Sequence, residues 1–187
     1  MLKYFEEFGK YVEITGFSHV KINDAEGFLK AARKEQQGAA IQFFNAGLVA
    51  TWQHLYFSVL NALTAFSNQR NISKSIAVEA MLYASAQRQI RKAITLVGVK
   101  RDSANLATVI IGENADALKA ALSSISKRVD AEPDETVLAL SNGKVQSIRE
   151  AFKISERELE TVMAKGDVQP ALVNLVIERM ALLSTQL

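Results

Sequence analysis

Alternating apolar and polar positions near the N-terminus of this sequence predict a β-strand. Residues Tyr11 to Phe17 alternate and are rich in side chains that favour strands. The short apolar run Ala40 to Phe44 is the pairing partner that we expect for it. Leu106 to Ile111 is more strongly apolar, which is typical of a strand in the middle of a sheet. A further strand is predicted over Thr136 to Leu140, before a turn at Asn142-Gly143.

Helical spacing predicts the elements between these strands. A capped helix with acids in its first turn opens at Asn23 to Glu26 and ends at Gly38. A longer helix spans Leu48 to Phe66, with apolar side chains every three or four residues along one face. Asn114 caps a helix that runs to about Arg128.

The last third of the chain is predicted to be helical. Ser155 to Glu158 form a capping box, and Pro170 sits near the start of the final helix, where a missing N–H costs little. The order of strands and helices favours a single α+β domain over residues 1–187, a small mixed sheet packed with about six to eight helices. The apolar side of the final helix consists of Leu172, Val173, Val176, Ile177, Met180 and Leu183.

The central helix is predicted to begin at Ser73 or Ser75 and to end at Gly98. Its polar face gathers Arg88, Arg91, Lys92 and Thr95, because residues three and four apart are neighbours on a helix. Its apolar stripe consists of Ile76, Tyr83, Ile90, Ala93, Ile94 and Val97.

Positive charge is concentrated in this same part of the chain. The segment from Asn68 to Arg101 holds seven basic residues and one acid, Glu79, so it carries +6 against +2 for the whole chain. Such an asymmetry indicates a surface that faces an anion, and nucleic acid is the commonest large polyanion in a cell. The alternative is a solvated helix face without a partner.

The composition argues against several other classes of protein. There is no cysteine, hence no disulfide, thiol nucleophile or cysteine metal site. No apolar run approaches the roughly 20 residues that span a membrane, and the N-terminus mixes aromatic and acidic residues, unlike an export signal. We therefore expect a cytoplasmic protein that does not enter a membrane.

Signs of catalysis are weak. The two histidines, His19 and His54, have no second histidine or carboxylate at ligand spacing, so we expect both to be structural. Phosphate-binding and dinucleotide-binding glycine motifs are missing from the sequence, as is a serine nucleophile elbow. Glu156, Glu158 and Glu160 belong to an exposed helix start. The sequence predicts no catalytic residue, no metal and no cofactor.

The segment from Arg70 to Ile90 carries a distinctive motif. An arginine and a serine, Arg70 and Ser73, precede a helix that contains Glu79, and an apolar pair, a small-residue step and the triplet Arg88-Gln89-Ile90 follow. This motif resembles the central signature of the KEOPS (EKC) complex regulatory subunit family, called PRPK-binding protein in animals. The Gln-Arg-Gln-Ile form is similar to that of archaeal members.

Weaker similarity to this family extends roughly from Val12 to Leu183. It includes Gly98-Val99 followed by an apolar strand, and the helix before the signature with Ala46, His54 and Leu55. Near the C-terminus it includes the segments Ile148 to Ser155 with Glu158, and Ile177 to Met180.

The resemblance implies a role in tRNA modification. The KEOPS complex makes N6-threonylcarbamoyladenosine beside the anticodon of tRNAs. One other subunit carries out the transferase chemistry and another is a small atypical kinase-ATPase. Members of this family dock on the N-terminal lobe of the kinase, support its activity and contribute to binding of the tRNA acceptor CCA end. The remaining subunits are reached through the kinase.

Two sets of contact residues follow as expectations. Gln89 is expected to hydrogen-bond a base edge, and Ile90 or Tyr83 to pack against a base. The residues expected to contact phosphates are Arg70, Lys74, Arg88, Arg91 and Lys92. Some of these residues also have a structural role that they could play instead of contacting RNA. Arg70 could form a buried ion pair with Glu79, and Ile90 and Tyr83 could belong to the core. The tRNA candidates are Arg70, Lys74, Arg88, Gln89, Ile90, Arg91 and Lys92.

The kinase is expected to dock on an apolar helical patch outside the sheet. The helix Leu48 to Phe66 and the final helix both qualify, with candidates Leu48, Trp52, Val173, Ile177 and Met180. Two other functions remain open at this point. One is a kinase regulator that never touches RNA, and the other is a small-molecule enzyme with a polar pocket lined by His54 and carboxylates.

Overall fold

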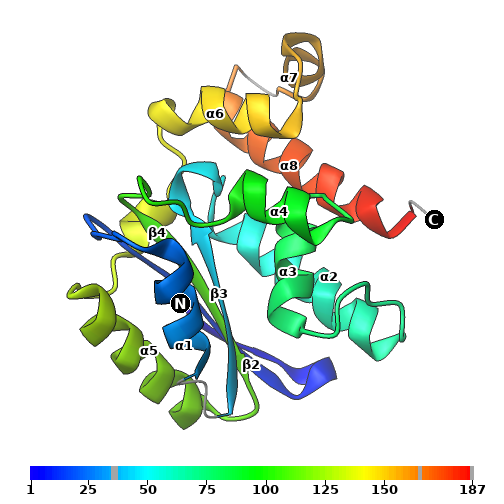
Figure 1. The fold of residues 1–187 in the computed structure, drawn as a ribbon. Coiled ribbons are helices and arrows are strands. Elements are labelled where there is room, and N and C mark those ends of the chain that lie inside the picture. The colour runs from blue at the N-terminus through cyan, green and yellow to red at the C-terminus, as the bar shows by residue number, and fades with distance from the viewer. Residues whose placement is uncertain (35–37, 164–165, 186–187) are drawn as a thin grey trace.

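A four-stranded antiparallel sheet lies at the centre of the molecule (Figure 1). The computed structural model describes residues 1–34, 38–163 and 166–185. The strands are β1 (Leu2–Phe5), β2 (Lys10–Phe17), β3 (Ala39–Asn45) and β4 (Leu106–Gly112), in the order β1-β2-β4-β3. The predicted α+β class is confirmed, but the sheet is antiparallel at every pairing of these strands and not mixed.

Strand β4 occupies the interior of the sheet, as its composition predicted. All seven of its residues are buried, and it pairs with β2 on one side and with β3 on the other. The expected pairing of Tyr11–Phe17 with Ala40–Phe44 is therefore wrong. A strand that is apolar on both faces loses most by standing at an edge, so β4 separates the two.

Helices cover both faces of the sheet (Figure 1). Helices α1 and α5 share one core with one face, while α2, α3 and, beyond them, α6 to α8 share the other. No helix in the described parts of the chain is long and apolar enough to cross a bilayer. The α-helices are α1 (Ala25–Lys34), α2 (Trp52–Ser67), α3 (Ile76–Ala84), α4 (Ile90–Val97), α5 (Ala115–Val129), α6 (Asn142–Phe152), α7 (Glu156–Val162) and α8 (Val168–Ala181). Short 3₁₀ turns are η1 (Glu6–Phe8), η2 (Ala46–Leu48), η3 (Glu135–Leu138) and η4 (Leu182–Thr185).

Most helix starts follow the capping signals in the sequence. The side chain of Asn114 accepts a hydrogen bond from the backbone of Ala117 at 2.8 Å, and Ser155 and Glu158 form both halves of their capping box. Pro170 lies in the first turn of α8. The predicted end of the first helix at Gly38 follows residues 35–37, which lie outside the described part of the chain.

The predicted strand over Thr136 to Leu140 is wrong, because this segment forms η3. The carboxylate of Asp134 accepts a hydrogen bond from the backbone N–H of Thr136 at 3.0 Å and starts the turn. The segment crosses β2 at Gly16, where a Cβ atom would lie 2.1 Å from Cγ2 of Val137. Glycine is therefore needed for this close approach. Asn142-Gly143, predicted as a turn, is the start of α6.

Candidate functional site

The central helix of the sequence prediction is broken into α3 and α4. Ser85 to Gln89 form a turn between them, in which Ala86 takes a left-handed conformation with φ of 50°. The backbone N–H of Gln87 donates to the carbonyl of Leu82 at 3.0 Å, which closes the C-terminus of α3. The hydroxyl of the buried Ser85 donates to the same carbonyl at 3.0 Å. The helical phase predicted beyond residue 84 is therefore incorrect.

The side chain of His54, on α2, hydrogen-bonds the last residue of α3 at this break. Its Nδ1 accepts the backbone N–H of Ala50 at 3.2 Å, so its Nε2–H donates to the carbonyl of Ala84 at 2.7 Å. Burial lowers the pKa of His54 to about 4; the Lys144 ammonium acts in the same direction and the hydrogen bond to Ala84 opposes it. The imidazole is therefore neutral and structural, as expected. Because His54 is fully buried and both its ring nitrogens are hydrogen-bonded inside the protein, it does not line the open polar pocket that would favour the small-molecule enzyme alternative.

The neutral state of His54 makes stability depend on pH. Unfolded chains take up the proton near pH 6.5, whereas the folded protein takes it up only near pH 4, so the unfolded state binds more protons between these values. Stability should fall as the pH drops through this window, by about 3 kcal/mol from this residue. Urea unfolding at steps between pH 7 and pH 4 measures the slope. His54→Gln should flatten it by about one proton; a slope unchanged from that of the native protein would contradict this assignment.

Helix α4 places its basic residues in solvent beside two apolar ones. Arg91, Lys92 and Thr95 are exposed, while Ala93 and Val97 face the core. Ile90 and Ile94 are 43% and 47% exposed, so the alternative in which Ile90 is a core residue is wrong. Tyr83, on α3, is only 6% exposed and belongs to the core. We call the exposed surface formed by Gln89, Ile90, Arg91, Lys92 and Ile94 the α4 face.

Arg88 stands at the edge of the α4 face and also contacts the C-terminal segment. Its Nη1 lies 3.5 Å from the carbonyl oxygen of Leu183, in η4. The residue nevertheless remains exposed. Gln89, in the N-cap position of α4, makes no side-chain capping bond, and its amide is exposed.

The residues at the start of the signature form a loop before α3 that is held by the side chain of Glu79. Glu79 is fully buried, and its carboxylate accepts hydrogen bonds from the backbone N–H groups of Ile72 at 3.1 Å and Ser73 at 2.7 Å. The alternative in which Arg70 pairs with Glu79 is therefore wrong: Arg70 is exposed, and no ion pair joins the two side chains. A buried carboxylate satisfied by backbone donors fixes the shape of the loop before α3.

Lys74 does not belong to the α4 face. It precedes α3, whereas Arg91 and Lys92 lie on the next helix, so the nine-residue length of α3 separates them. Nine helical residues extend about 13 Å. The single basic helix face that the sequence predicted is thus two separate surfaces, one at each end of α3.

A groove lies between the starts of α2 and α8. It has a volume of about 510 Å³, and Trp52 from α2 and Val173 from α8 both line it. The two helices proposed as kinase interfaces therefore meet at one place. The groove is also lined by Leu138, Leu140, Pro170 and Asn174, which sequence reasoning missed. Leu138 and Leu140 were missed because the segment Thr136 to Leu140 was predicted as a strand. Asp134, two residues before Thr136, is a capping signal that could have indicated a helical turn there.

Lys144 connects the segment before α2 to η3, next to this groove. Its ammonium donates to the carbonyls of Val49, just before α2, and of Val137, in η3. Burial lowers the pKa of Lys144 to about 8. The remaining kinase candidates differ in exposure: Leu48 and Ile177 are half-buried, whereas Met180 is fully buried. Met180 therefore packs inside the protein and has no surface to offer a partner.

Comparison with known proteins identifies the family. The family model described as kinase binding protein CGI-121 matches residues 17–184. The regulatory protein Cgi121 of Methanocaldococcus jannaschii is 34% identical over 131 residues, which cover 67% of this chain and 82% of that protein. The chain belongs to the CGI-121 family. This confirms the resemblance drawn from the central signature, and the archaeal relative agrees with the archaeal form of that signature.

Membership in the CGI-121 family makes this a regulatory, kinase-binding type of protein. In the described ranges, no three His, Cys, Asp or Glu side chains gather closely enough to hold a metal ion. The features that stand out are surfaces: the α4 face at the end of the signature, and the groove between α2 and α8.

Proposed function

We propose that this protein is a non-catalytic adaptor of a KEOPS-type complex. It binds the atypical kinase-ATPase and helps bring the 3′ CCA end of tRNA to the complex for N6-threonylcarbamoyladenosine modification. In this proposal residues 1–187 form one domain that works in the cytoplasm and reaches the other subunits through the kinase. The observation that carries the RNA half is the α4 face, where exposed cations and exposed isoleucines belong to the same short helix.

The α4 face suits a short single-stranded end of RNA. Such an end presents phosphates together with unstacked bases, so a binding site needs cations and an apolar surface within a small area. Arg91 and Lys92 supply the cations, Ile90 and Ile94 the apolar surface, and the free amide of Gln89 a donor and an acceptor for a base edge. An eight-residue helix is about 12 Å long, which is too short to wrap a duplex.

The groove between α2 and α8 supports the kinase half of the proposal. Interfaces are organised around buried aromatic and apolar anchors with a polar rim. Trp52, Leu138 and Pro170 supply the apolar wall here, and Gln169 and Asn174 are exposed beside it. We therefore place kinase docking at this groove and remove Met180 from the candidates because it is fully buried.

Electrophoretic mobility with intact tRNA and with tRNA lacking its CCA end tests the RNA half. The intact molecule should bind, and removal of CCA should weaken binding at least tenfold. Because a few phosphate contacts release a few counterions, affinity should drop about tenfold between 50 mM and 200 mM salt. A pull-down with the cognate kinase, made on the same preparation, tests the other half.

The two assays distinguish failure of the kinase-binding part of the proposal from failure of the tRNA-binding part. A protein that captures the kinase but binds neither tRNA would be a kinase regulator without RNA contact, and the adaptor proposal would then be wrong. Binding to both tRNAs with equal affinity would mean that the protein contacts RNA elsewhere than at the CCA end.

A further inference from the structure

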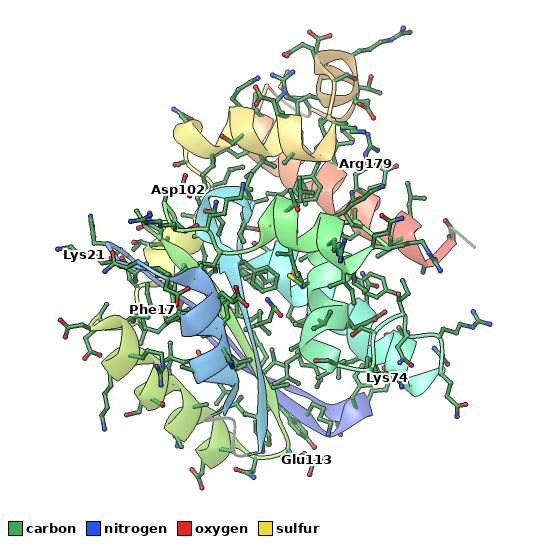
Figure 2. The ribbon with its side chains drawn as sticks, viewed as in Figure 1. Phe17, Lys21, Lys74, Asp102, Glu113 and Arg179 are labelled. Atoms are coloured by element: carbon green, nitrogen blue, oxygen red, sulfur yellow. The ribbon has the colours of Figure 1, made fainter. Side chains whose placement is uncertain are left out.

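A second cavity lies at the opposite end of α3 from the α4 face. Its volume is about 490 Å³, and it opens where the end of β4 and the start of β3 meet the end of α2 and the start of α3. Figure 2 shows Lys74 and Glu113 at this end of the molecule. Neither the proposed RNA surface nor the kinase groove includes it.

Small residues at the sheet end create this space. In the register of the sheet, Ala39 pairs with Gly112 and Ala40 pairs with Ile111, so three of these four positions have a methyl group or no side chain. Leu63 and Phe66 of α2 and Ile76 of α3 stand across from them and do not fill the gap. The walls are therefore mostly apolar, and the charged residues that line the cavity are Lys10, Lys74 and Glu113.

The charge at the rim is unbalanced. Nζ of Lys10 lies 2.8 Å from Oε1 of Glu113, and this hydrogen-bonded pair lowers the pKa of Glu113. The ammonium of Lys74 is exposed, and no described side chain pairs with it. One positive charge is therefore left at the mouth of an apolar cavity.

The backbone that carries Lys74 is held in place on both sides. The N–H of Ser73 donates to the buried carboxylate of Glu79, and the N–H of Ser75 donates to the hydroxyl of Ser73 at 3.2 Å. Because this loop is already ordered, placing an anion beside Lys74 does not require ordering of its backbone.

We propose that this cavity is a binding site for a small organic anion with an apolar body, such as a medium-chain fatty acid or an aromatic acid. The volume lies within the range of about 300–1,000 Å³ that is typical of small-molecule sites. The apolar body would fill the space between Ala40, Phe66 and Ile76, and the anionic group would pair with Lys74.

Two fluorescent probes that differ in charge test this site. One is 1-anilinonaphthalene-8-sulfonate, which carries an anion, and the other is the neutral N-phenyl-1-naphthylamine. Both should bind the native protein. Lys74→Met should weaken the anionic probe about threefold, as expected for an exposed ion pair, and leave the neutral probe unchanged. Ala40→Phe should fill the cavity and weaken both probes more than tenfold.

Lys21→Met is the matched control, because Lys21 is exposed and lies far from the cavity (Figure 2). Thermal unfolding shows whether Ala40→Phe has folded, and Ile76→Trp on the cavity wall replaces it if it has not. The proposal is overturned if neither probe binds, if filling the cavity changes nothing, or if Lys74→Met affects both probes equally. Displacement of the anionic probe by decanoate but not by decanol would support it further.

Discussion

Replacing Glu79 with alanine should lower the free energy of unfolding by about 3 kcal/mol. The buried carboxylate accepts backbone hydrogen bonds from Ile72 and Ser73, and its removal leaves the N–H of Ser73 buried without an acceptor. A space the size of the side chain remains as well. Urea unfolding followed by circular dichroism measures the change as a shift of the midpoint.

Two further variants separate the causes of this loss. Glu79→Gln keeps the shape and one carbonyl acceptor, so it should lose roughly half as much stability. Glu160→Ala removes an exposed carboxylate and should stay within about 0.5 kcal/mol of the native protein. A loss below about 1 kcal/mol in Glu79→Ala would show that the loop before α3 is held by other contacts.

Reversing the charges of Arg91 and Lys92 together should weaken tRNA binding about thirtyfold, because each cation is replaced by a group that repels phosphate. The fold should tolerate this change. Both residues lie in the first turn of α4, where acidic side chains interact favourably with the helix dipole. Affinity for intact tRNA at a fixed salt concentration is the measurement, and binding of the cognate kinase should be retained.

Asn174→Arg provides the reciprocal variant. Asn174 is exposed and lines the groove between α2 and α8, so a longer charged side chain should obstruct kinase docking without touching the core. It should weaken kinase binding at least tenfold and leave tRNA binding intact. If both variants impaired both partners, the α4 face and the groove would not be separate binding surfaces.

Local signals in the sequence predicted local structure well. The apolar run of β4, the Asn114 cap and the Ser155–Glu158 capping box all lie where they were expected, because each depends on neighbours within a few residues. The pairing partners of β2 and β3 were not predictable in this way. Both strands alternate or bury apolar side chains, and neither pattern encodes that β4 lies between them.

In the candidate site, too, local features were predictable from the sequence and contacts between distant residues were not. Helical periodicity continued the central helix through Ser85 and Ala86, whereas α3 ends at Ala84 and α4 begins at Ile90. Two residues of the predicted apolar stripe, Ala93 and Val97, are buried as expected, but Ile90 and Ile94 on the same stripe are exposed. The break depends on the contact between His54 and the carbonyl of Ala84, thirty positions apart. The expected alternative for Glu79, an ion pair with Arg70, was wrong because its partners are backbone N–H groups, which have no signature in the sequence.

The interior position of β4 also governs the order in which the chain acquires its structure during synthesis. Strands β2 and β3 are complete by Asn45, yet both form their ladder with a strand that begins at Leu106. A nascent chain ending before that residue can form only the β1–β2 ladder, and it leaves the other edge of β2 and the whole of β3 without a partner strand. Consolidation of the fold therefore awaits emergence of β4 from the ribosome, and a fragment truncated near residue 100 should associate with itself or with chaperones.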